Sequence, residues 1–418
     1  MDRIDFRDDL ILGVATASTQ IEGGDTNNTW YNWTKNHDKT KDGNDCFLCN
    51  SHYKNYKEHI DLMAKLKIQS YRLSIEWSRI EPLNNHFNEE AINHYIDEIK
   101  YCHKLGISTI VTLHHFSNPL WFEELGGFKK KSSIFYFNRF TEYVAKKLNG
   151  LVKDFCTINE PNVYATSCFL LKEWINEESN FFTCMKVLRN MCYCHIEAYK
   201  TLHKIIKDAN VGIALNLDYF EAYNKKSIID KFGAWFYNHC FNYMISDGMG
   251  HGKFTLPLGL RFKSGDYFDF IGINYYTSHT IKFFKMGIKD DVPHNDLGWA
   301  ITPNCLGFFL DKFHELYPNK EIYITENGTC DKQDAFRCKY LLDHLKIVNE
   351  RPFVKRYYQW TFMDNFEWKE GLGPCFGIVE YHYEDATYTP RNSAYFYQHI
   401  IENRYVDDNI FNKYIKKE

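Results

Sequence analysis

The sequence predicts an α/β fold, namely a single (β/α)8 barrel, or TIM barrel, whose active site lies at the C-terminal ends of the strands. Three observations support this prediction. Eight short β-like runs occur along the 418 residues, longer amphipathic stretches alternate with them, and no Pro/Gly/Ser linker or internal repeat divides the chain. Because a barrel with insertions can exceed about 400 residues, we expect one domain over residues 1–418.

The predicted strands are apolar runs rich in β-branched and aromatic residues. In chain order they are "LILGVATA" (10–17), "SYRLSIEW" (70–77), "STIVTLHH" (108–115), "DFCTINE" (154–160), "NVGIALNL" (210–217), "DFIGINYY" (269–276), "IYITENG" (322–328) and "VKRYYQWTF" (354–362). The predicted helices have apolar residues at helical spacing. They include "YKNYKEHIDLMAKLK" (53–67), "NEEAINHYIDEIKYCHKLG" (88–106), "MKVLRNMCYCHIEAYKTLHKIIKD" (185–208) and "AFRCKYLLDHLKIV" (335–348).

Composition and charge exclude several classes of function. With 44% hydrophobic and 17% aromatic residues, the chain can bury a large core and is globular. Fifty basic residues stand against 54 acidic ones, the net charge is −4, and the basic residues are scattered. Charge therefore predicts binding to neither nucleic acid nor a membrane surface.

The N-terminus and the cysteines indicate a reducing compartment. The first apolar stretch follows four aspartates and lacks a basic leader, so we expect neither signal peptide nor anchor, and a cytoplasmic protein. Thirteen cysteines, mostly within apolar segments, are typical of free thiols. Cys46 and Cys49 form a CxxC, but no second CxxC completes a zinc site. We expect no metal and no cofactor.

Polar residues follow almost every predicted strand, at the end where a barrel carries its active site. They are Gln20 and Glu22, Arg72 and Glu76, His115, Asn159 and Glu160, Asn274 to Tyr276, Glu326 and Asn327, and Trp360 with Glu367 and Trp368. Two glutamates, Glu160 and Glu326, stand three strands apart around the ring. Glycoside hydrolysis requires a pair of carboxyl groups. Amides bind the hydroxyl groups of the sugar, and aromatic rings pack against its faces.

Several segments resemble one family. "GVATASTQIEGG", "YRLSIEWSRIEP", "TLHHF", "TINEPN", "GINYYT", "YITENG" and "WTFMDNFEW" are similar, in this order, to glycoside hydrolase family 1, the retaining β-glucosidases and β-galactosidases. The resemblance runs from about residue 10 to 380. It implies the barrel already predicted and a catalytic domain that hydrolyses O-glycosyl bonds by a two-carboxylate double displacement.

The resemblance implies a role for each matching residue. Glu160 matches the general acid/base and Glu326 the nucleophile, with Arg72 and Tyr276 beside the nucleophile. Asn159 matches the residue that binds the sugar 2-hydroxyl. Gln20, His115 and Glu367 match residues that hold the other hydroxyls, and Trp360, Trp368 and Phe376 would line the faces of the sugar. A guanidinium near Glu326 would keep it ionised, whereas Glu160 needs a raised pKa to arrive protonated.

Each residue also has a structural interpretation. Glu160 could cap the helix that starts at Pro161, Arg72 could form a structural ion pair, and the two tryptophans could be core residues. The chain also departs from the family. The loop "SCFLLKEWINEESNFF" after Glu160 is unlike that of relatives, and Phe116 stands where many have Trp. Aglycone preference therefore does not follow from the resemblance.

Three functions fit the sequence. The first is a retaining β-glycosidase, in particular a β-glucosidase, that hydrolyses an unphosphorylated small-molecule β-glycoside. The second is a 6-phospho-β-glycosidase, and the third is a barrel that binds sugars without hydrolysing them. We favour the first, because both carboxylates are present and because Glu367 and Trp368 keep the pattern of family members that act on plain sugars.

Overall fold

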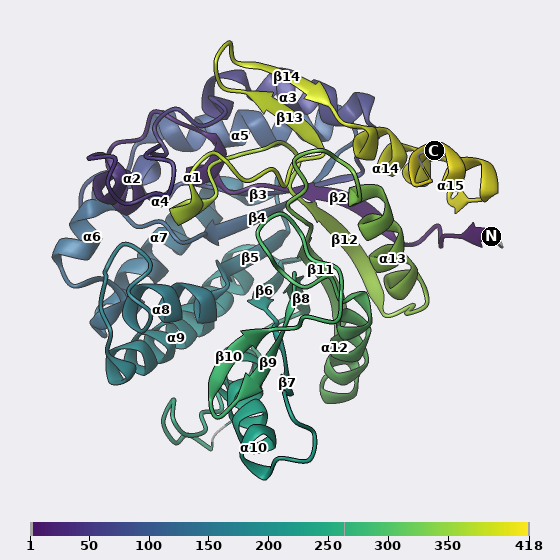
Figure 1. Ribbon diagram of the computed structural model, residues 1–418. Coiled ribbons are helices and arrows are strands. Elements are labelled where there is room, and N and C mark those ends of the chain that lie inside the picture. The colour runs from purple at the N-terminus through teal and green to yellow at the C-terminus, as the bar shows by residue number, and fades with distance from the viewer. Residues whose placement is uncertain (1–2, 263, 417–418) are drawn as a thin grey trace.

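The computed structural model describes residues 3–262 and 264–416. Eight parallel strands close into a barrel in the order β11-β12-β2-β3-β4-β5-β6-β8 (Figure 1). They are β2 (Ile11–Ala15), β3 (Ser70–Ser74), β4 (Ser108–His114), β5 (Asp154–Asn159), β6 (Asn210–Asn216), β8 (Phe270–Tyr275), β11 (Glu321–Asn327) and β12 (Val354–Trp360). Seven of the eight predicted runs contain one of these strands, and the run 322–328 covers all of β11 except Glu321, which confirms the (β/α)8 fold. The second run was predicted too long, because β3 ends at Ser74 and Glu76 is the N-cap of a short helix.

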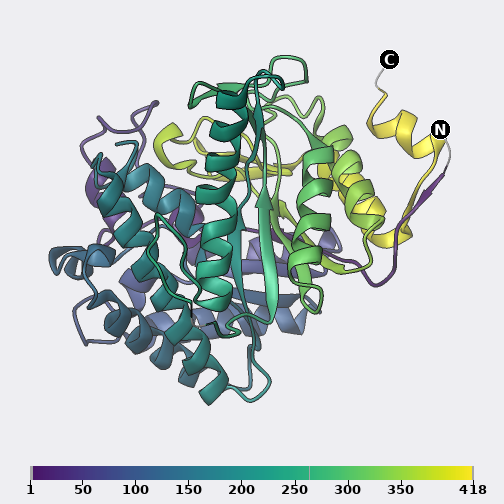
Figure 2. The same cartoon turned by 90° about the horizontal axis from the view of Figure 1, so that it is seen from below.

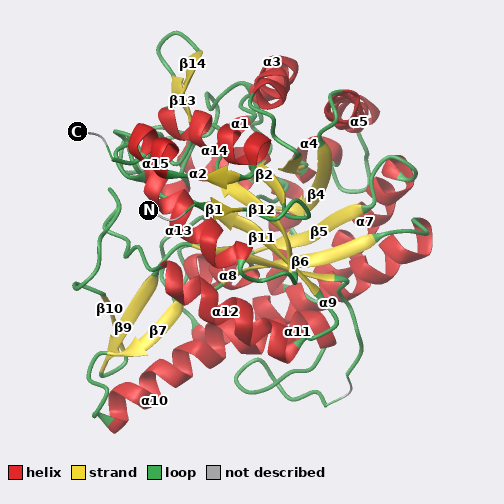
Figure 3. Ribbon diagram, turned by 90° about the vertical axis from the view of Figure 1, so that its right-hand side faces the viewer, coloured by secondary structure: helices red, strands yellow, loops and turns green. Residues whose placement is uncertain are grey.

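Helices surround the barrel (Figure 3). The longer ones are α3 (His52–Lys65), α5 (Glu89–Lys104), α7 (Ser133–Leu148), α9 (Phe181–Ile205), α12 (Pro303–Leu316), α13 (Arg337–Asn349) and α14 (Asn392–Asn403). The four predicted helices are α3, α5, α9 and α13. Helix α5 shows how the sequence specifies them. The side chain of Asn88 accepts from the backbone of Glu90 and Ala91, and Ile92, Tyr95 and Ile99 lie on the buried face.

Shorter elements complete the structure at the strand ends and near the termini. They are α1 (Ser18–Ile21), α2 (Thr29–Thr34), α4 (Trp77–Ile80), α6 (Leu120–Glu124), α8 (Pro161–Phe169), α15 (Asp408–Tyr414) and the hairpin of β13 (Val379–His382) and β14 (Thr387–Pro390). Strand β1 (Ile4–Asp5) pairs with β15 (Tyr405–Val406), so both ends of the described chain lie together (Figure 1).

A second sheet projects from the barrel. It contains β7 (Tyr219–Ala222), β9 (Ser278–Lys282) and β10 (Lys285–Ile288) in the order β10-β9-β7. Helix α10 (Ile228–Tyr237) contacts this sheet and continues through a π-helical turn, 238–243, into α11 (Met244–His251). Figure 2 shows this helix running alongside the strands. Because β7 and β9 begin just after β6 and β8 end, the projection starts from the C-terminal end of the barrel.

The barrel interior is filled by side chains from many strands. Ile110, Cys156, Ala214, Phe270 and Tyr323 belong to one buried cluster. Above it, the register places polar residues side by side: Asn274 is paired with Asn216 on one neighbouring strand and with Glu326 on the other. Among the described residues, no helix is long and apolar enough to cross a bilayer.

Candidate active site

Glu160 and Glu326 are both buried at the C-terminal end of the barrel, with 5% and 3% of their surfaces exposed. Glu160 occupies the N-cap position of α8, but its carboxylate accepts no hydrogen bond from the described backbone of that helix. Instead its Oε1 accepts from Asn274 Nδ2 at 2.7 Å and from Asn216 Nδ2 at 3.1 Å. The capping interpretation of Glu160 is therefore wrong.

The backbone at Glu160 has a conformation that few residues other than glycine adopt. Its φ is 40° and its ψ 60°, in the left-handed region. Its N–H donates to the carbonyl of Ala214 on β6 at 2.8 Å, which fixes the turn between β5 and α8. Strained backbone of this kind occurs mainly at functional sites. Here it aims the carboxylate at the amides of β6 and β8 instead of along the helix.

Glu326 has a cationic partner, unlike Glu160. Arg72 Nη1 donates to Glu326 Oε1 at 2.5 Å, and Tyr276 OH donates to Oε2 at 2.7 Å. The Arg72 guanidinium is itself 1% exposed and also donates to Asn159 Oδ1 at 2.6 Å. Arg72 therefore forms an ion pair, as the structural interpretation held, but that pair holds the carboxylate of Glu326 at the strand ends.

These environments act differently on the two carboxyl groups. Burial, and then the negative charge of Glu326, raise the pKa of Glu160 to about 8. Burial also raises the pKa of Glu326, but the charge of Arg72 and hydrogen bonds from Tyr276 and Arg72 oppose that rise. Arg72 thus favours the ionised form of Glu326, whereas burial and a neighbouring negative charge favour the protonated form of Glu160. Such a difference between two carboxyl groups is what distinguishes a nucleophile from a general acid.

Asn159 and His115 are joined in the same network. Asn159 Oδ1 accepts from Arg72 and Asn274, so its Nδ2 faces His115 Nε2, 3.1 Å away. Burial, followed by the charge of Arg72, keeps the pKa of His115 well below its usual value, so the ring is neutral. Because Nε2 accepts, the proton lies on Nδ1, which has no hydrogen-bond partner among the described residues.

Gln20 and Glu367 are hydrogen-bonded to each other. Gln20 belongs to α1, and Glu367 belongs to the segment that follows β12. Gln20 Nε2 donates to the carbonyl of Phe366 at 2.7 Å and to Glu367 Oε2 at 3.3 Å. Gln20 Oε1 is buried without a described partner. Burial, then the charges of Glu326 and Glu160, raise the pKa of Glu367 to about 8. The three carboxyl groups are therefore electrostatically coupled.

Aromatic rings stand beside these polar groups. The His115 ring lies nearly parallel to two tryptophan rings, with centroid distances of 5.9 Å to Trp360 and 6.0 Å to Trp368. Phe376 lies 6.3 Å from the ring of Tyr276. The structure thus brings all eleven predicted site residues into one connected region. Their roles toward a substrate stay a prediction.

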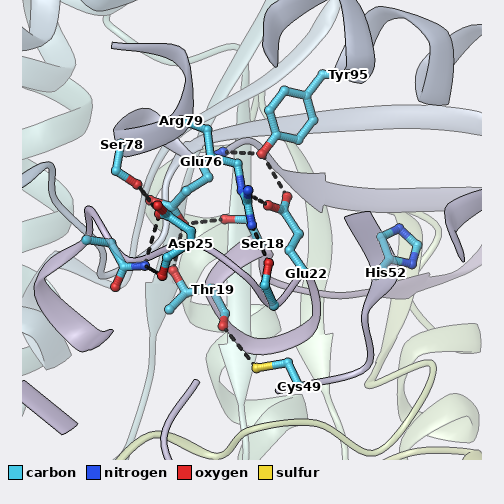
Figure 4. A network of polar contacts seen from close by, with 12 residues as sticks. Ser18, Thr19, Glu22, Asp25, Cys49, His52, Glu76, Ser78, Arg79 and Tyr95 are labelled. Carbon is cyan, nitrogen blue, oxygen red and sulfur yellow. Dashed lines mark hydrogen bonds and ion pairs between the residues drawn. The ribbon is translucent and has the colours of Figure 1, made fainter. Parts of the chain in front are cut away.

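A buried polar network holds the segment that carries Gln20 (Figure 4). Glu76 accepts from the hydroxyls of Ser18 and Thr19 at 3.0 and 2.7 Å. Glu22 accepts from Arg79 Nε at 2.7 Å and from Tyr95 OH at 2.8 Å. Glu22 and Glu76, both among the polar residues at the predicted strand ends, therefore act within this network and have no contact with Glu160 or Glu326 among the described hydrogen bonds.

Sequence reasoning missed two residues of the site, Asn216 and Trp174, and gave no role to a third, Asn274, which it placed among the polar residues at the strand ends. Asn216 and Asn274 donate to Glu160, although "ALNL" and "GINYY" gave only a generic sign, an asparagine at a strand end. Trp174 comes from the divergent loop after α8. Its ring lies 5.0 Å from Phe116 and 5.7 Å from Trp368, so this loop contributes an aromatic side chain to the rim of the site.

The remaining candidates have structural surroundings. His114 faces away from His115, and its Nε2 contacts Asn118 Oδ1 at 2.9 Å. Cys46 and Cys49 are buried, and burial raises the pKa of both thiols. In the described ranges, no group of three or more His, Cys, Asp or Glu side chains is arranged to hold a metal ion.

Comparison with known proteins identifies one family. The sequence profile described as "Glycosyl hydrolase family 1" matches residues 2–255 and 261–406. Beta-glucosidase A of Thermotoga maritima is 28% identical to this chain, over 96% of it and 99% of that protein. Beta-glucosidase A of Acetivibrio thermocellus is 29% identical, over 96% of this chain and 99% of its own.

Solved structures agree with the sequence comparison. The family 1 β-glucosidase of Thermotoga maritima superposes with a TM-score of 0.90 at 27% identity and covers 98% of this chain and 100% of its own. A β-glycosidase of Pyrococcus horikoshii gives a TM-score of 0.89 at 33% identity and covers 98% of both chains. Their barrels are the fold described above.

Proposed function

This chain belongs to glycosyl hydrolase family 1 and is a glycoside hydrolase acting on O-glycosyl bonds, and we propose that it is a retaining β-glucosidase for unphosphorylated β-glycosides. The observation that carries the proposal is the contrast between the two buried glutamates. Glu326 is held by Arg72 and Tyr276, whereas Glu160 accepts only from amides and has a pKa of about 8.

In the first step, an oxygen of Glu326 attacks the anomeric carbon while Glu160 gives its proton to the glycosidic oxygen. The bond to the aglycone breaks, and the sugar is left as an ester of Glu326. In the second step, Glu160, now ionised, takes a proton from water, and that water displaces Glu326 from the anomeric carbon. Two inversions leave the product in the β configuration.

Two buried polar atoms of the site that have no hydrogen-bond partner among the described residues support the binding of a sugar there. Gln20 Oε1 can accept from a hydroxyl, and His115 Nδ1–H can donate to one. The rings of Trp360 and Trp368 offer apolar surface to the C–H faces of a pyranose. Related structures support the same view, since those of the Thermotoga maritima enzyme are described in complex with isofagomine lactam, glucoimidazole and deoxynojirimycin.

Other parts of the proposal concern the whole chain. We expect residues 1–418 to act as one catalytic domain that needs no cofactor. No disulfide joins the thirteen cysteines, all of which lie within the described residues, and ten of them are buried, which supports a reducing compartment such as the cytoplasm.

Mechanism-based labelling tests the nucleophile. A 2-deoxy-2-fluoro β-glucoside with an activated leaving group should trap the ester on Glu326, because the fluorine slows both steps and the activated leaving group restores the rate of the first step alone. Mass spectrometry of a proteolytic digest should find the label on the peptide that contains Glu326. Proton NMR of an early reaction mixture should show β-glucose as the first product. A label on another residue, or α-glucose first, would overturn the assignment.

The position of Glu367 predicts discrimination against sugars phosphorylated at the 6-position. Its neighbours Glu326, Glu160 and Glu370 all raise its pKa, so a phosphate of charge near −2 would enter a site surrounded by carboxyl groups. We expect kcat/KM for p-nitrophenyl β-glucoside or β-galactoside to exceed that for the 6-phosphates by about 100-fold or more.

The variant Glu367→Ser is the matched comparison for this prediction. It removes one carboxyl group and should narrow the ratio of kcat/KM between plain and phosphorylated substrates, mainly by weakening hydrolysis of the plain ones. A wild-type preference for either 6-phosphate would refute the proposal and favour a 6-phospho-β-glycosidase.

A further inference from the structure

Helix α10 presents an apolar face to solvent. Its packing side, against the projecting sheet, is formed by Gly233 and Ala234, which are buried. The opposite side carries Ile228, Phe232 and Trp235, which are 83%, 54% and 57% exposed. A surface helix ordinarily places polar residues on this side and apolar ones against the core. Helix α10 therefore has a second apolar face, most of whose surface is exposed to solvent.

The adjacent hairpin carries more exposed apolar side chains at a strained turn. Phe283 and Phe284 connect β9 to β10, and their φ angles are 47° and 62°. Two-residue turns with both φ values positive favour Asn-Gly, and bulky residues in this region are outliers. The two rings are nevertheless 62% and 41% exposed, so burial does not compensate for the strain. Strain without a packing benefit indicates that these side chains serve a function.

The helix and the hairpin form one surface. The Phe232 ring lies 5.5 Å from Trp235 and 5.8 Å from Phe284. Met286 pairs with Ile281, which contacts the packing side of α10, so β10 extends the surface at the edge of the sheet. We call this surface the α10 face, and it comprises Ile228, Ile229, Phe232, Trp235, Phe283, Phe284, Met286 and Ile288, each at least 41% exposed. Contiguous apolar patches of this kind mark interaction sites.

Lysines surround the α10 face. Residues 223–239 and 278–289 contain six lysines and one acidic residue, Asp230, which is buried. Lys226, Lys231 and Lys285 are exposed and form no ion pair with any described residue. Glu221, just before these ranges, pairs with Lys225 and Lys289, and Asp290 and Asp291 follow Lys289. The positive charge of this surface therefore comes from the lysines without an ion pair, in a chain whose net charge is −4.

We propose that the α10 face docks on the surface of a membrane that contains anionic phospholipids. The aromatic and aliphatic side chains would enter the boundary between headgroups and acyl chains, and the lysines would contact the negatively charged headgroups. A second copy of the chain fits less well, because a symmetric contact would bring the lysines of both copies together. The scattered charges of the sequence predicted no membrane contact, but they did not reveal which residues the fold gathers on one face.

Flotation of the full-length protein with lipid vesicles tests the proposal. We expect binding to phosphatidylcholine vesicles that contain phosphatidylserine, and weaker binding to phosphatidylcholine alone. The double variants Phe232→Ser/Trp235→Ser and Lys226→Glu/Lys285→Glu should each lower the bound fraction by about tenfold or more. Added salt should weaken binding of the wild type.

Matched variants on other surfaces control for general effects. Phe135→Ser/Phe182→Ser removes two rings that are 64% and 83% exposed outside the α10 face, and Lys130→Glu/Lys131→Glu reverses two exposed lysines. Both should bind vesicles like the wild type. Thermal unfolding by circular dichroism, which does not depend on the proposed activity, should confirm that all variants are folded.

Three results would overturn the proposal. The first is no binding to vesicles with phosphatidylserine. The second is equal binding by the α10-face variants and the wild type. The third is concentration-dependent self-association that Phe232→Ser/Trp235→Ser abolishes, without any vesicle binding, which would assign the α10 face to a contact between copies of this chain.

Discussion

Replacing Glu326 by alanine is expected to lower kcat by about 10⁶-fold on every β-glycoside, whatever its leaving group. The first step requires an oxygen at the anomeric carbon, and the carboxylate that Arg72 and Tyr276 hold is the proposed source. An activated leaving group does not help, because the missing bond is to the sugar. Initial rates with 2,4-dinitrophenyl β-glucoside and cellobiose should therefore fall in parallel.

Azide distinguishes this loss from a general collapse of the site. A small anion that occupies the cavity left by Glu326→Ala attacks from the side opposite the leaving group and gives the α-glucosyl azide by a single inversion. Formation of this product would show that Glu326→Ala is folded and still binds the substrate and its leaving group. Formation of the β-azide, or activity within about tenfold of wild type, would contradict the assignment of Glu326 as nucleophile.

The barrel was predictable because its strands are buried on both faces and appear as short apolar runs. The position of the site followed from the same reasoning, since polar residues after such runs gather at one end of a barrel. Glu160 and Glu326 could be selected because a carboxylate directly after an apolar strand is conspicuous. The exact end of β3 was missed, because "IEW" continues the apolar pattern although Glu76 already occupies the N-cap position of α4.

The amides that bind Glu160 could not be selected in the same way. Asn274 lies 114 positions and Asn216 56 positions from Glu160 in the sequence, and only the strand register brings them together. The projecting sheet was missed for another reason. Its strands are short. In addition, a helical pattern assigns the apolar residues of α10 to the core, whereas in the structure these residues are exposed to solvent.

Replacing Glu160 by alanine is expected to have an effect that depends on the leaving group. For cellobiose, kcat/KM should fall by about 10³- to 10⁴-fold, because the departing hydroxyl no longer receives a proton. For 2,4-dinitrophenyl β-glucoside, kcat/KM should stay within about tenfold of wild type, since this phenolate leaves without one. The second step loses its base, so a burst of phenolate should precede slow turnover. Azide should restore turnover and yield the β-glucosyl azide.

The pH profile supplies an independent readout of the same group. Burial and the charge of Glu326 raise the pKa of Glu160 to about 8, so the acid is protonated at neutral pH and loses its proton as the pH rises. In the wild type, kcat/KM for cellobiose should therefore fall as the pH rises through about 8. Glu160→Gln cannot ionise, and its residual activity on cellobiose should lack this alkaline decline.

Glu367 is the competing source of an alkaline decline, because its pKa is also raised to about 8. The two variants separate the two groups. If the decline persists in Glu160→Gln and disappears in Glu367→Gln, the titrating group is Glu367, and the pKa of Glu160 does not limit the reaction. If Glu160→Ala loses equal activity on cellobiose and on the dinitrophenyl glucoside, proton donation is not its role. Glu160 would then be a positioning residue that orients Asn216 and Asn274 through their hydrogen bonds to its carboxylate. A different residue would supply the acid.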